Sequence, residues 1–157
     1  PGLGTTFRIY LPRFKAEGME SPDESAAVIP PRGTETVLIV EDDEAILSLG
    51  KKILNGLGYK VLTANAPAEA IRLAGQHTGA IHLLLTDVVM PEMNGRVLME
   101  KLHAVRPEMK SLFMSGYTAN VVAHHGVLDE GVHFIEKPFS PKALAEKVRE
   151  VLDRSQA

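Results

Sequence analysis

Several acidic and other polar side chains stand where short apolar runs of the sequence end. They are Glu41 and Asp42 after residues 36–40, Asp87 at the end of 81–87, Ser115 at the end of 110–115, and Lys137 after 132–136. Carboxylates that lie close together repel one another, and their pKa values rise unless a cation neutralises them. Because this set offers oxygen ligands but no histidine or cysteine, it suits a hard cation such as Mg²⁺. The residues therefore predict a magnesium site, if the fold brings the ends of these runs together.

The apolar runs alternate with helical patterns, and this alternation predicts how the polar residues meet. Strands are expected at 36–40, 59–64, 81–87, 110–115 and 132–136, where apolar and branched side chains follow one another. Helices are expected at 45–58, 67–77, 95–105, 119–129 and 140–154, the last with Ser140 as its N-cap. The pattern predicts an α/β fold, a doubly wound five-stranded parallel sheet with helices on both faces. The carboxyl ends of such strands share one edge, where we expect the polar residues to converge.

The composition excludes several classes of function. The chain has 157 residues, no cysteine and a net charge of -3. Disulfides and thiolate metal sites are therefore excluded, and the charge gives no reason to expect nucleic acid as a partner. No apolar run approaches the roughly 20 residues of a membrane-spanning helix, and no signal peptide is visible. We therefore expect no direct membrane contact and a cytoplasmic location.

The sequence divides into three parts by composition. Residues 15–34 are rich in Pro, Ser, Gly and acidic residues and follow neither a helical nor a strand period, which is typical of a linker. The alternating pattern occupies residues 35–157, which form the expected domain. Residues 1–14 are a separate segment, whose alternating apolar side chains predict a short strand.

Four stretches of the expected domain resemble a known family. "VLIVEDDE", "LLLTDVVMPEMNG", "FMSGYT" and "FIEKPFS" are similar to the four signature stretches of the receiver domain of bacterial two-component response regulators, in the family's order and spacing. The resemblance covers about 35–155 and implies a flavodoxin-like, three-layer α/β/α fold. It also implies a function in signal transduction, in which an aspartate accepts a phosphoryl group from a phosphohistidine and the domain switches conformation.

The resemblance implies an acceptor and a metal site. Asp87 matches the phosphoacceptor. Glu41 and Asp42 match the acidic pair that holds Mg²⁺ together with Asp87, and Val89 would add its backbone carbonyl. Asp43 follows the pair, and we interpret it mainly as a cap of the first helix.

The resemblance also implies phosphate-binding and switch residues. Lys137 would supply a point charge to the phosphoryl group, and the family usually has a cis proline after it, here Pro138. Ser115 would supply a hydroxyl donor and move toward the phosphate. Phe134 matches the aromatic switch position, where the family often has tyrosine; the alternative is that Phe134 is simply part of the core.

Two further expectations concern loops near the acceptor. Val89 and Tyr117 match the positions at which the family tunes the access of water, and an apolar and a bulky residue there suggest slow loss of the phosphate. In the loop before the third helix, Asn94 or Gly95 is expected to allow an unusual backbone angle.

The first segment carries a second resemblance. "GLGTTFRIYLPR" is similar to the end of the ATP-binding domain of histidine kinases. With the linker and the receiver, it implies the C-terminal receiver of a hybrid sensor histidine kinase, whose full chain could be membrane-anchored. The other ATP-binding motifs are missing from these residues, so enzyme activity of this chain itself is left open, and the donor histidine is expected elsewhere. The segment could pair with the edge of the sheet or with a second copy, which would give a dimer.

Three alternative functions share parts of this pattern. A stand-alone response regulator would share the receiver, but the kinase-like segment argues against it. An aspartyl-phosphate hydrolase of the haloacid-dehalogenase type would have a second aspartate where this chain has Val89. A non-phosphorylated interaction module would not need the acids, Ser115 and Lys137.

Overall fold

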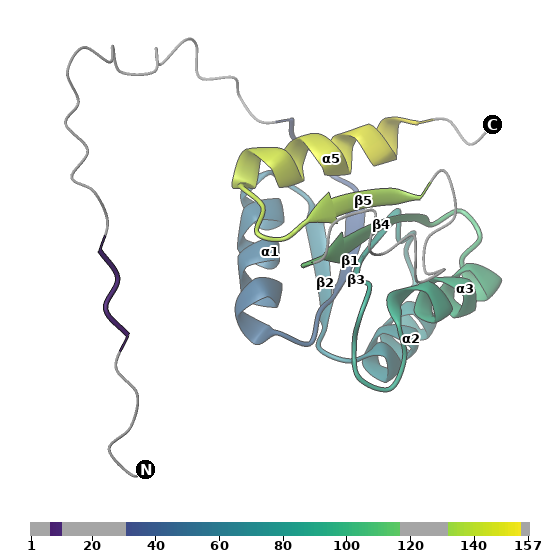
Figure 1. Cartoon of the computed structure of the whole chain (residues 1–157). Helices are drawn as coiled ribbons and strands as arrows, with labels where there is room; N and C mark the ends of the chain where they lie inside the picture. Colours follow the sequence, from purple (N-terminus) through teal and green to yellow (C-terminus); the bar gives the residue numbers. More distant parts are fainter. Residues whose placement is uncertain (1–6, 11–30, 117–131, 155–157) are drawn as a thin grey trace.

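The computed structural model describes residues 7–10, 31–116 and 132–154. Strands and helices alternate between residues 36 and 115, and a strand and a helix make up the last described range (Figure 1). The elements are β1 (Thr36–Val40), α1 (Glu44–Gly56), β2 (Lys60–Ala64), α2 (Pro67–Gln76), β3 (Leu83–Asp87), α3 (Gly95–Val105), β4 (Lys110–Ser115), β5 (His133–Glu136) and α5 (Pro141–Asp153). The helix expected at 119–129 lies outside the described residues.

The five strands form one parallel sheet in the order β2-β1-β3-β4-β5. Helices α1 and α5 cover one face of the sheet, and α2 and α3 cover the other (Figure 1). The chain winds outward in both directions from the neighbouring strands β1 and β3, and this switch point is where such sheets place their functional residues. The predicted doubly wound fold is confirmed.

The alternation of side chains along each strand divides the core in two. Val37 and Ile39 of β1 pack with α1 and α5, whereas Leu38 and Val40 pack with α2 and α3. All four are at most 1% exposed. Because both faces of β1 are buried, the strand reads as a continuous apolar run, and it holds the residue after it rigidly at the edge of the sheet.

Polar side chains cap the helices beside that edge. Asp43 accepts hydrogen bonds from the N–H groups of Ala45 (2.8 Å) and Ile46 (3.2 Å), which confirms it as the N-cap of α1. Ser140 caps α5 as expected, by accepting from the N–H of Ala143 at 3.1 Å. These caps satisfy backbone N–H groups in the first turns of α1 and α5 and so stabilise the starts of both helices.

Residues before β1 are packed on the domain. The N–H of Gly33 donates to the carbonyl of Leu57 (3.2 Å), and Glu35 forms an ion pair with Arg149 of α5 (2.8 Å). Residues 7–10, where a strand was expected, form no regular structure, and Phe7, Ile9 and Tyr10 are exposed. None of the helices in the described ranges has the length and apolar character needed to cross a membrane.

Candidate functional site

Glu41 and Asp42 leave β1 at the carboxyl edge of the sheet. The N–H of Glu41 donates to the carbonyl of Ala64 at the end of β2 (3.2 Å), which extends the pairing of the strands by one residue. The side chain of Glu41 is 1% exposed, whereas Asp42 is exposed. A buried carboxylate needs a partner to remain charged.

Asp87 ends the neighbouring strand β3, and its carboxylate is held from two sides. The N–H of Val89 donates to Oδ1 of Asp87 (3.2 Å), and the ammonium of Lys137 donates to Oδ2 (2.8 Å). The side chain of Asp87 is 15% exposed. The carboxylate is therefore oriented by the protein but still reachable from solvent.

Lys137 connects the end of β5 to the ends of three other strands, β1, β3 and β4. It follows β5, and besides Asp87 its ammonium donates to Oε2 of Glu41 at 2.5 Å. Its backbone N–H donates to the carbonyl of Ser115 at the end of β4 (2.7 Å), and the Lys137–Pro138 peptide bond is cis, as the resemblance implied. One cation thus bridges two carboxylates that are distant in the sequence.

Burial and charge act against each other in this group. Burial raises the pKa of Glu41, and the hydrogen bond and charge of Lys137 do not fully offset that effect. Burial alone would lower the pKa of Lys137, but its bonds with Asp87 and Glu41 outweigh burial and raise the pKa. Two carboxylates that share one ammonium keep an excess of negative charge, which a further cation would stabilise.

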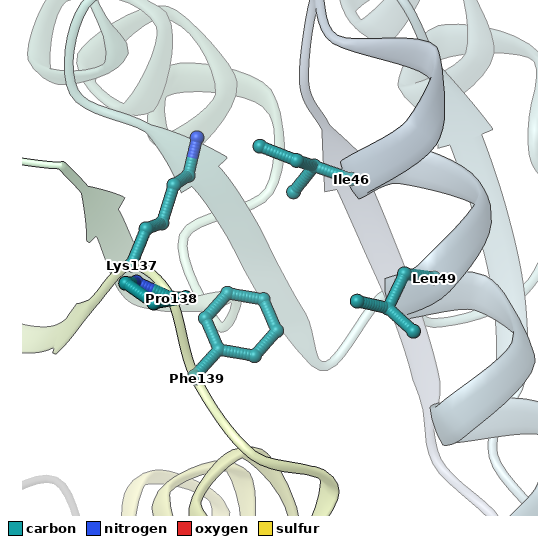
Figure 2. A pocket seen from close by; sticks show the side chains of 5 residues that line it. All are labelled: Ile46, Leu49, Lys137, Pro138 and Phe139. Carbon is teal, nitrogen blue, oxygen red and sulfur yellow. The ribbon is translucent and has the colours of Figure 1, made fainter. Parts of the chain in front are cut away.

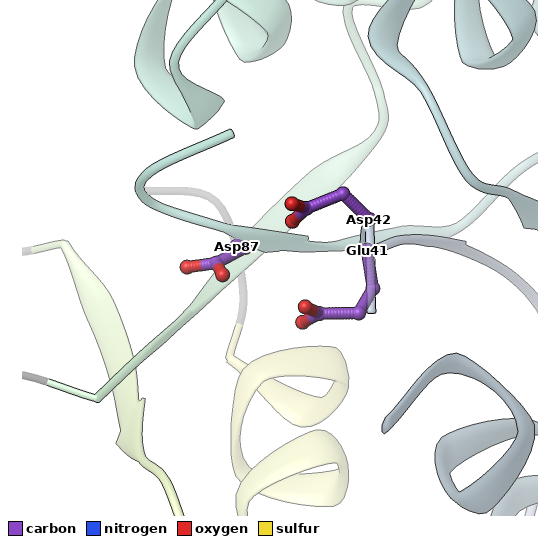
Figure 3. Close-up of side chains that lie close together, drawn as sticks. All are labelled: Glu41, Asp42 and Asp87. Carbon is purple, nitrogen blue, oxygen red and sulfur yellow. The ribbon is translucent and has the colours of Figure 1, made fainter. Parts of the chain in front are cut away.

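The acidic residues converge as the sequence predicted. Oxygen atoms of Glu41, Asp42 and Asp87 lie within 4.8 Å of one another (Figure 3). Three carboxylates at this spacing, with one exposed and one partly exposed, fit a hard divalent cation that keeps part of its water shell. The donor set therefore suits Mg²⁺.

Ser115 and Phe134 occupy the neighbouring strands. Ser115 is the last residue of β4 and is 1% exposed, opposite Glu136 of β5. Phe134 is partly buried against a small cluster with Val88, the residue after Asp87, and Phe113. Tyr117 lies outside the described residues.

The loop after Asp87 differs from the expectation. The residue with positive φ is Glu92 (68°), not Asn94 or Gly95. Asn94 caps α3 by accepting from the N–H of Val97 (2.9 Å). Gly95 is needed for space, because a Cβ there would lie 2.1 Å from the backbone oxygen of Asp87. The requirement at Gly95 is close approach of two backbones rather than an unusual angle.

One polar residue near the acceptor was missed. Thr86 is fully buried, and its hydroxyl donates to the backbone carbonyl of Asp87 (3.1 Å). A hydroxyl inside an otherwise apolar strand was the signal that could have identified it.

An apolar hollow of about 270 Å³ adjoins Lys137 (Figure 2). Ile46 and Leu49 of α1 line one side of it, and Pro138 and Phe139 line the other. Leu49 is 47% exposed. The edge that carries the carboxylates therefore borders an exposed apolar surface.

The amino-acid sequence of this chain is similar to sequences of known proteins. Residues 37–149 match the family described as response regulator receiver domain. The sensor kinase CckA of Brucella abortus (strain 2308) is 36% identical over 162 residues, which covers 98% of this chain and 17% of that protein. The DNA-binding transcriptional regulator NtrC of Azospirillum brasilense is 30% identical over 118 residues, or 75% of this chain and 24% of that protein. The chain thus spans less than a quarter of either relative.

Solved structures of receiver domains have the same fold as this chain. A receiver domain protein (CheY-like) from Methanospirillum hungatei JF-1 is 36% identical, with a TM-score of 0.65 over 77% of this chain and 95% of that one. The receiver domain of the hybrid histidine kinase CckA is 35% identical, with a TM-score of 0.64 over 75% of this chain and 99% of that one.

Proposed function

The chain belongs to the response regulator receiver domain family, and on that premise we propose that Asp87 is the phosphoacceptor of this receiver. Receivers of this family act as phosphoacceptors in two-component signalling. The observation that carries the proposal for this chain is the position of Lys137, whose ammonium bonds both Asp87 (2.8 Å) and the buried Glu41 (2.5 Å).

In the proposed reaction, a carboxylate oxygen of Asp87 attacks the phosphorus of a phosphohistidine and forms an acyl phosphate. The phosphorus–nitrogen bond breaks, and its electron pair returns to the imidazole, which takes a proton from water. The transition state of such a transfer is loose, so the protein contributes mainly position and charge neutralisation. Val89 and Lys137 donate hydrogen bonds to the carboxylate and so orient it, and in this proposal Lys137 and Ser115 would bind the incoming phosphoryl oxygens.

We assign the acidic cluster to Mg²⁺. Receiver domains generally bind this ion at an acidic cluster, and here Glu41, Asp42 and Asp87 would hold it, with the backbone carbonyl of Val89 as a further ligand. When bound, the ion supplies a compact divalent charge that neutralises phosphoryl oxygens. The burial that raises the pKa of Glu41 makes a nearby cation favourable.

Intact mass after incubation with acetyl phosphate and Mg²⁺ tests this assignment. The chain is expected to gain one phosphate, and Asp87→Asn is expected to gain none. Asp43→Asn is the matched control, because it makes the same chemical change close by and asparagine can still cap α1. If the chain gains no phosphate, or if Asp87→Asn gains it as well, the assignment is wrong.

The proposed phosphodonor is a histidine-bearing protein that docks beside the site. The exposed apolar hollow next to Lys137 supports a protein donor, because a small phosphodonor would not need it (Figure 2). Leu49→Asp, which puts a charge in this hollow, should slow transfer from a phosphohistidine protein and leave the rate of the reaction with acetyl phosphate unchanged. Val105→Asp is the control, since Val105 is an exposed valine on α3. Equal slowing with both donors would contradict a docking role.

We further propose that the chain is the receiver portion of a hybrid sensor histidine kinase in the cytoplasm. The match to a sensor kinase covers 98% of this chain, whereas the family match begins at residue 37, so the similarity to that kinase includes residues before the receiver. The parent polypeptide should autophosphorylate with labelled ATP and pass the label to Asp87. A parent polypeptide without an ATP-binding domain would favour a stand-alone response regulator.

A further inference from the structure

A polar pocket lies at the opposite edge of the sheet from Asp87. Its volume is about 260 Å³, and its polar lining comes from α3, β4, β5 and the residue that follows α5. These side chains are His103, Lys110, Ser111, His133 and Arg154, above a floor that includes the buried Val151. Lys110 and His133 are the first residues of β4 and β5, whereas Ser115 and Lys137 stand at the far ends. Six residues of strand separate the two edges by about 17 Å, so this pocket is not part of the acidic site.

Positive charge gathers around the pocket. The ammonium of Lys110 donates to the carbonyls of Leu152 (2.7 Å) and Arg154 at the end of α5, which holds it at the wall. Arg154 and Lys147 share a single carboxylate, that of Glu150, at 3.3 and 2.8 Å. Among these described groups, the three cations Lys110, Lys147 and Arg154 therefore lie near a single carboxylate, that of Glu150.

The remaining polar groups can donate to a ligand. His103 and Ser111 lie 3.3 Å apart, Nε2 to Oγ; in the tautomer that carries a proton on Nε2, His103 donates to Ser111 and leaves the hydroxyl hydrogen of Ser111 for a ligand. Burial lowers the pKa of His133, and the charges of Arg154, Lys147 and Lys110 lower it further, while Glu150 acts in the opposite direction. The ring thus lies in a positive potential that a bound anion would relieve.

We propose that this pocket binds a small oxyanion of the phosphate or phosphomonoester class, independently of phosphorylation at Asp87. The planar fork of Arg154 suits two oxygens of such an ion, and the ring N–H of His133 and the hydroxyl of Ser111 complete its donors. Lys110 adds charge while it remains bound to the end of α5.

Nuclear magnetic resonance titration with inorganic phosphate tests the proposal. The full chain with Asp87→Asn is used without Mg²⁺, so that the acidic site takes no part. Saturable shifts at Ser111 and His133 are expected with phosphate, and none with chloride at the same ionic strength. A parallel titration with glycerol phosphate shows whether the preferred ligand is the free ion or an ester.

Matched variants make the result specific. Arg154→Gln and His133→Gln should each weaken binding roughly tenfold, the loss expected for one charge-assisted hydrogen bond. Arg72→Gln should leave binding unchanged, because Arg72 is an exposed arginine of α2 paired with Glu69 and Gln76. Shifts that fail to saturate, that chloride reproduces, or that Arg154→Gln and His133→Gln leave intact would overturn the proposal.

Discussion

In the described part of the chain, Lys137 supplies the positive charge that contacts the carboxylates of the acidic site. Lys137→Met removes the cation that bonds Asp87 and Glu41 and leaves the incoming phosphoryl group without this positive partner. Phosphorylation by acetyl phosphate with Mg²⁺ should become about 100-fold slower, an effect typical of losing one preorganised electrostatic contact. The rate is measured by intact mass over time.

Lys142→Met is the control for that change. Lys142 stands a few residues further along, but its side chain is 63% exposed and its contact with Glu146 is 3.9 Å. The Lys142→Met chain should be phosphorylated at the same rate as the unaltered chain. Similar slowing in both variants would show that the effect does not come from the site.

Val89 is expected to lengthen the lifetime of the phosphorylated chain. Its side chain is apolar and 61% exposed beside the acceptor, so it offers attacking water no hydrogen bond. The phosphorylated chain should therefore persist well beyond seconds in Mg²⁺, and Val89→Asn should shorten its lifetime several-fold. The decay is followed by mass after removal of acetyl phosphate. Val105→Asn, at an equally exposed valine, should leave the lifetime unchanged; a fast decay of the unaltered chain would refute this account.

The sequence predicted the polar groups of the site better than it predicted their surroundings. Glu41, Asp87 and Lys137 follow or end buried strands, and the parallel sheet brings them together. The positive φ at Glu92 was missed, because glutamate carries no preference for that conformation and the neighbouring Asn94 and Gly95 do.

At the scale of elements, the loop from β3 to α3 brings Gly95 against the backbone of Asp87. Gly95→Ala would put a Cβ 2.1 Å from the backbone oxygen of Asp87, so the loop must shift. We expect a loss of about 2 kcal/mol in the free energy of unfolding and slower phosphorylation. Both are measured on one preparation, by urea unfolding and by intact mass.

Gly75→Ala is the matched control for Gly95→Ala. Gly75 lies in α2, and a Cβ there has no atom within 4 Å. Alanine should raise the free energy of unfolding by up to about 1 kcal/mol, because it favours the helix, and leave phosphorylation unchanged. A Gly95→Ala chain as stable and active as Gly75→Ala would contradict the close-approach argument.

The ion pair of Glu35 with Arg149 ties the start of β1 to α5. Burial alone would raise the pKa of Glu35, but hydrogen bonds from its own backbone and from Arg149 outweigh burial and lower it below 4.5. Its contribution to stability is therefore present above pH 4.5 and is lost as the pH falls through the lowered pKa. Glu35→Gln should cost about 0.5–1 kcal/mol at neutral pH.

Urea unfolding at two pH values tests this sign. The difference between Glu35→Gln and the unaltered chain should be largest at neutral pH and shrink well below pH 4.5. Glu146→Gln, at a looser pair with Lys142 of 3.9 Å, should show little difference at either pH. A difference that grows in acid would have the wrong sign.

Element types were easier to predict than element ends. The run at 81–87 predicted a strand, but β3 begins at Leu83, where its pairing with Val37 of β1 begins. Apolar periodicity reports burial, and buried residues continue beyond the paired segment. Ion pairs such as that of Glu35 with Arg149 could not be predicted, because the sequence does not specify which opposite charge a residue will contact.

At the scale of the whole molecule, stability should depend on the residues just before β1. A chain that starts at residue 36 loses the bond of Gly33 to Leu57 and the ion pair of Glu35, and should unfold at a lower temperature than a chain that starts at residue 31. Calorimetry of the two chains measures this, and equal unfolding temperatures would contradict it.

The bond of Gly33 to Leu57 also fixes where the receiver is tethered. It attaches the preceding chain near the amino ends of the strands, whereas Asp87 stands at the carboxyl ends. In the proposed hybrid kinase, this attachment leaves the acidic edge open to a donor that docks there. The acidic edge points away from its tether, so the receiver could also pass its phosphate to a separate carrier while it stays attached.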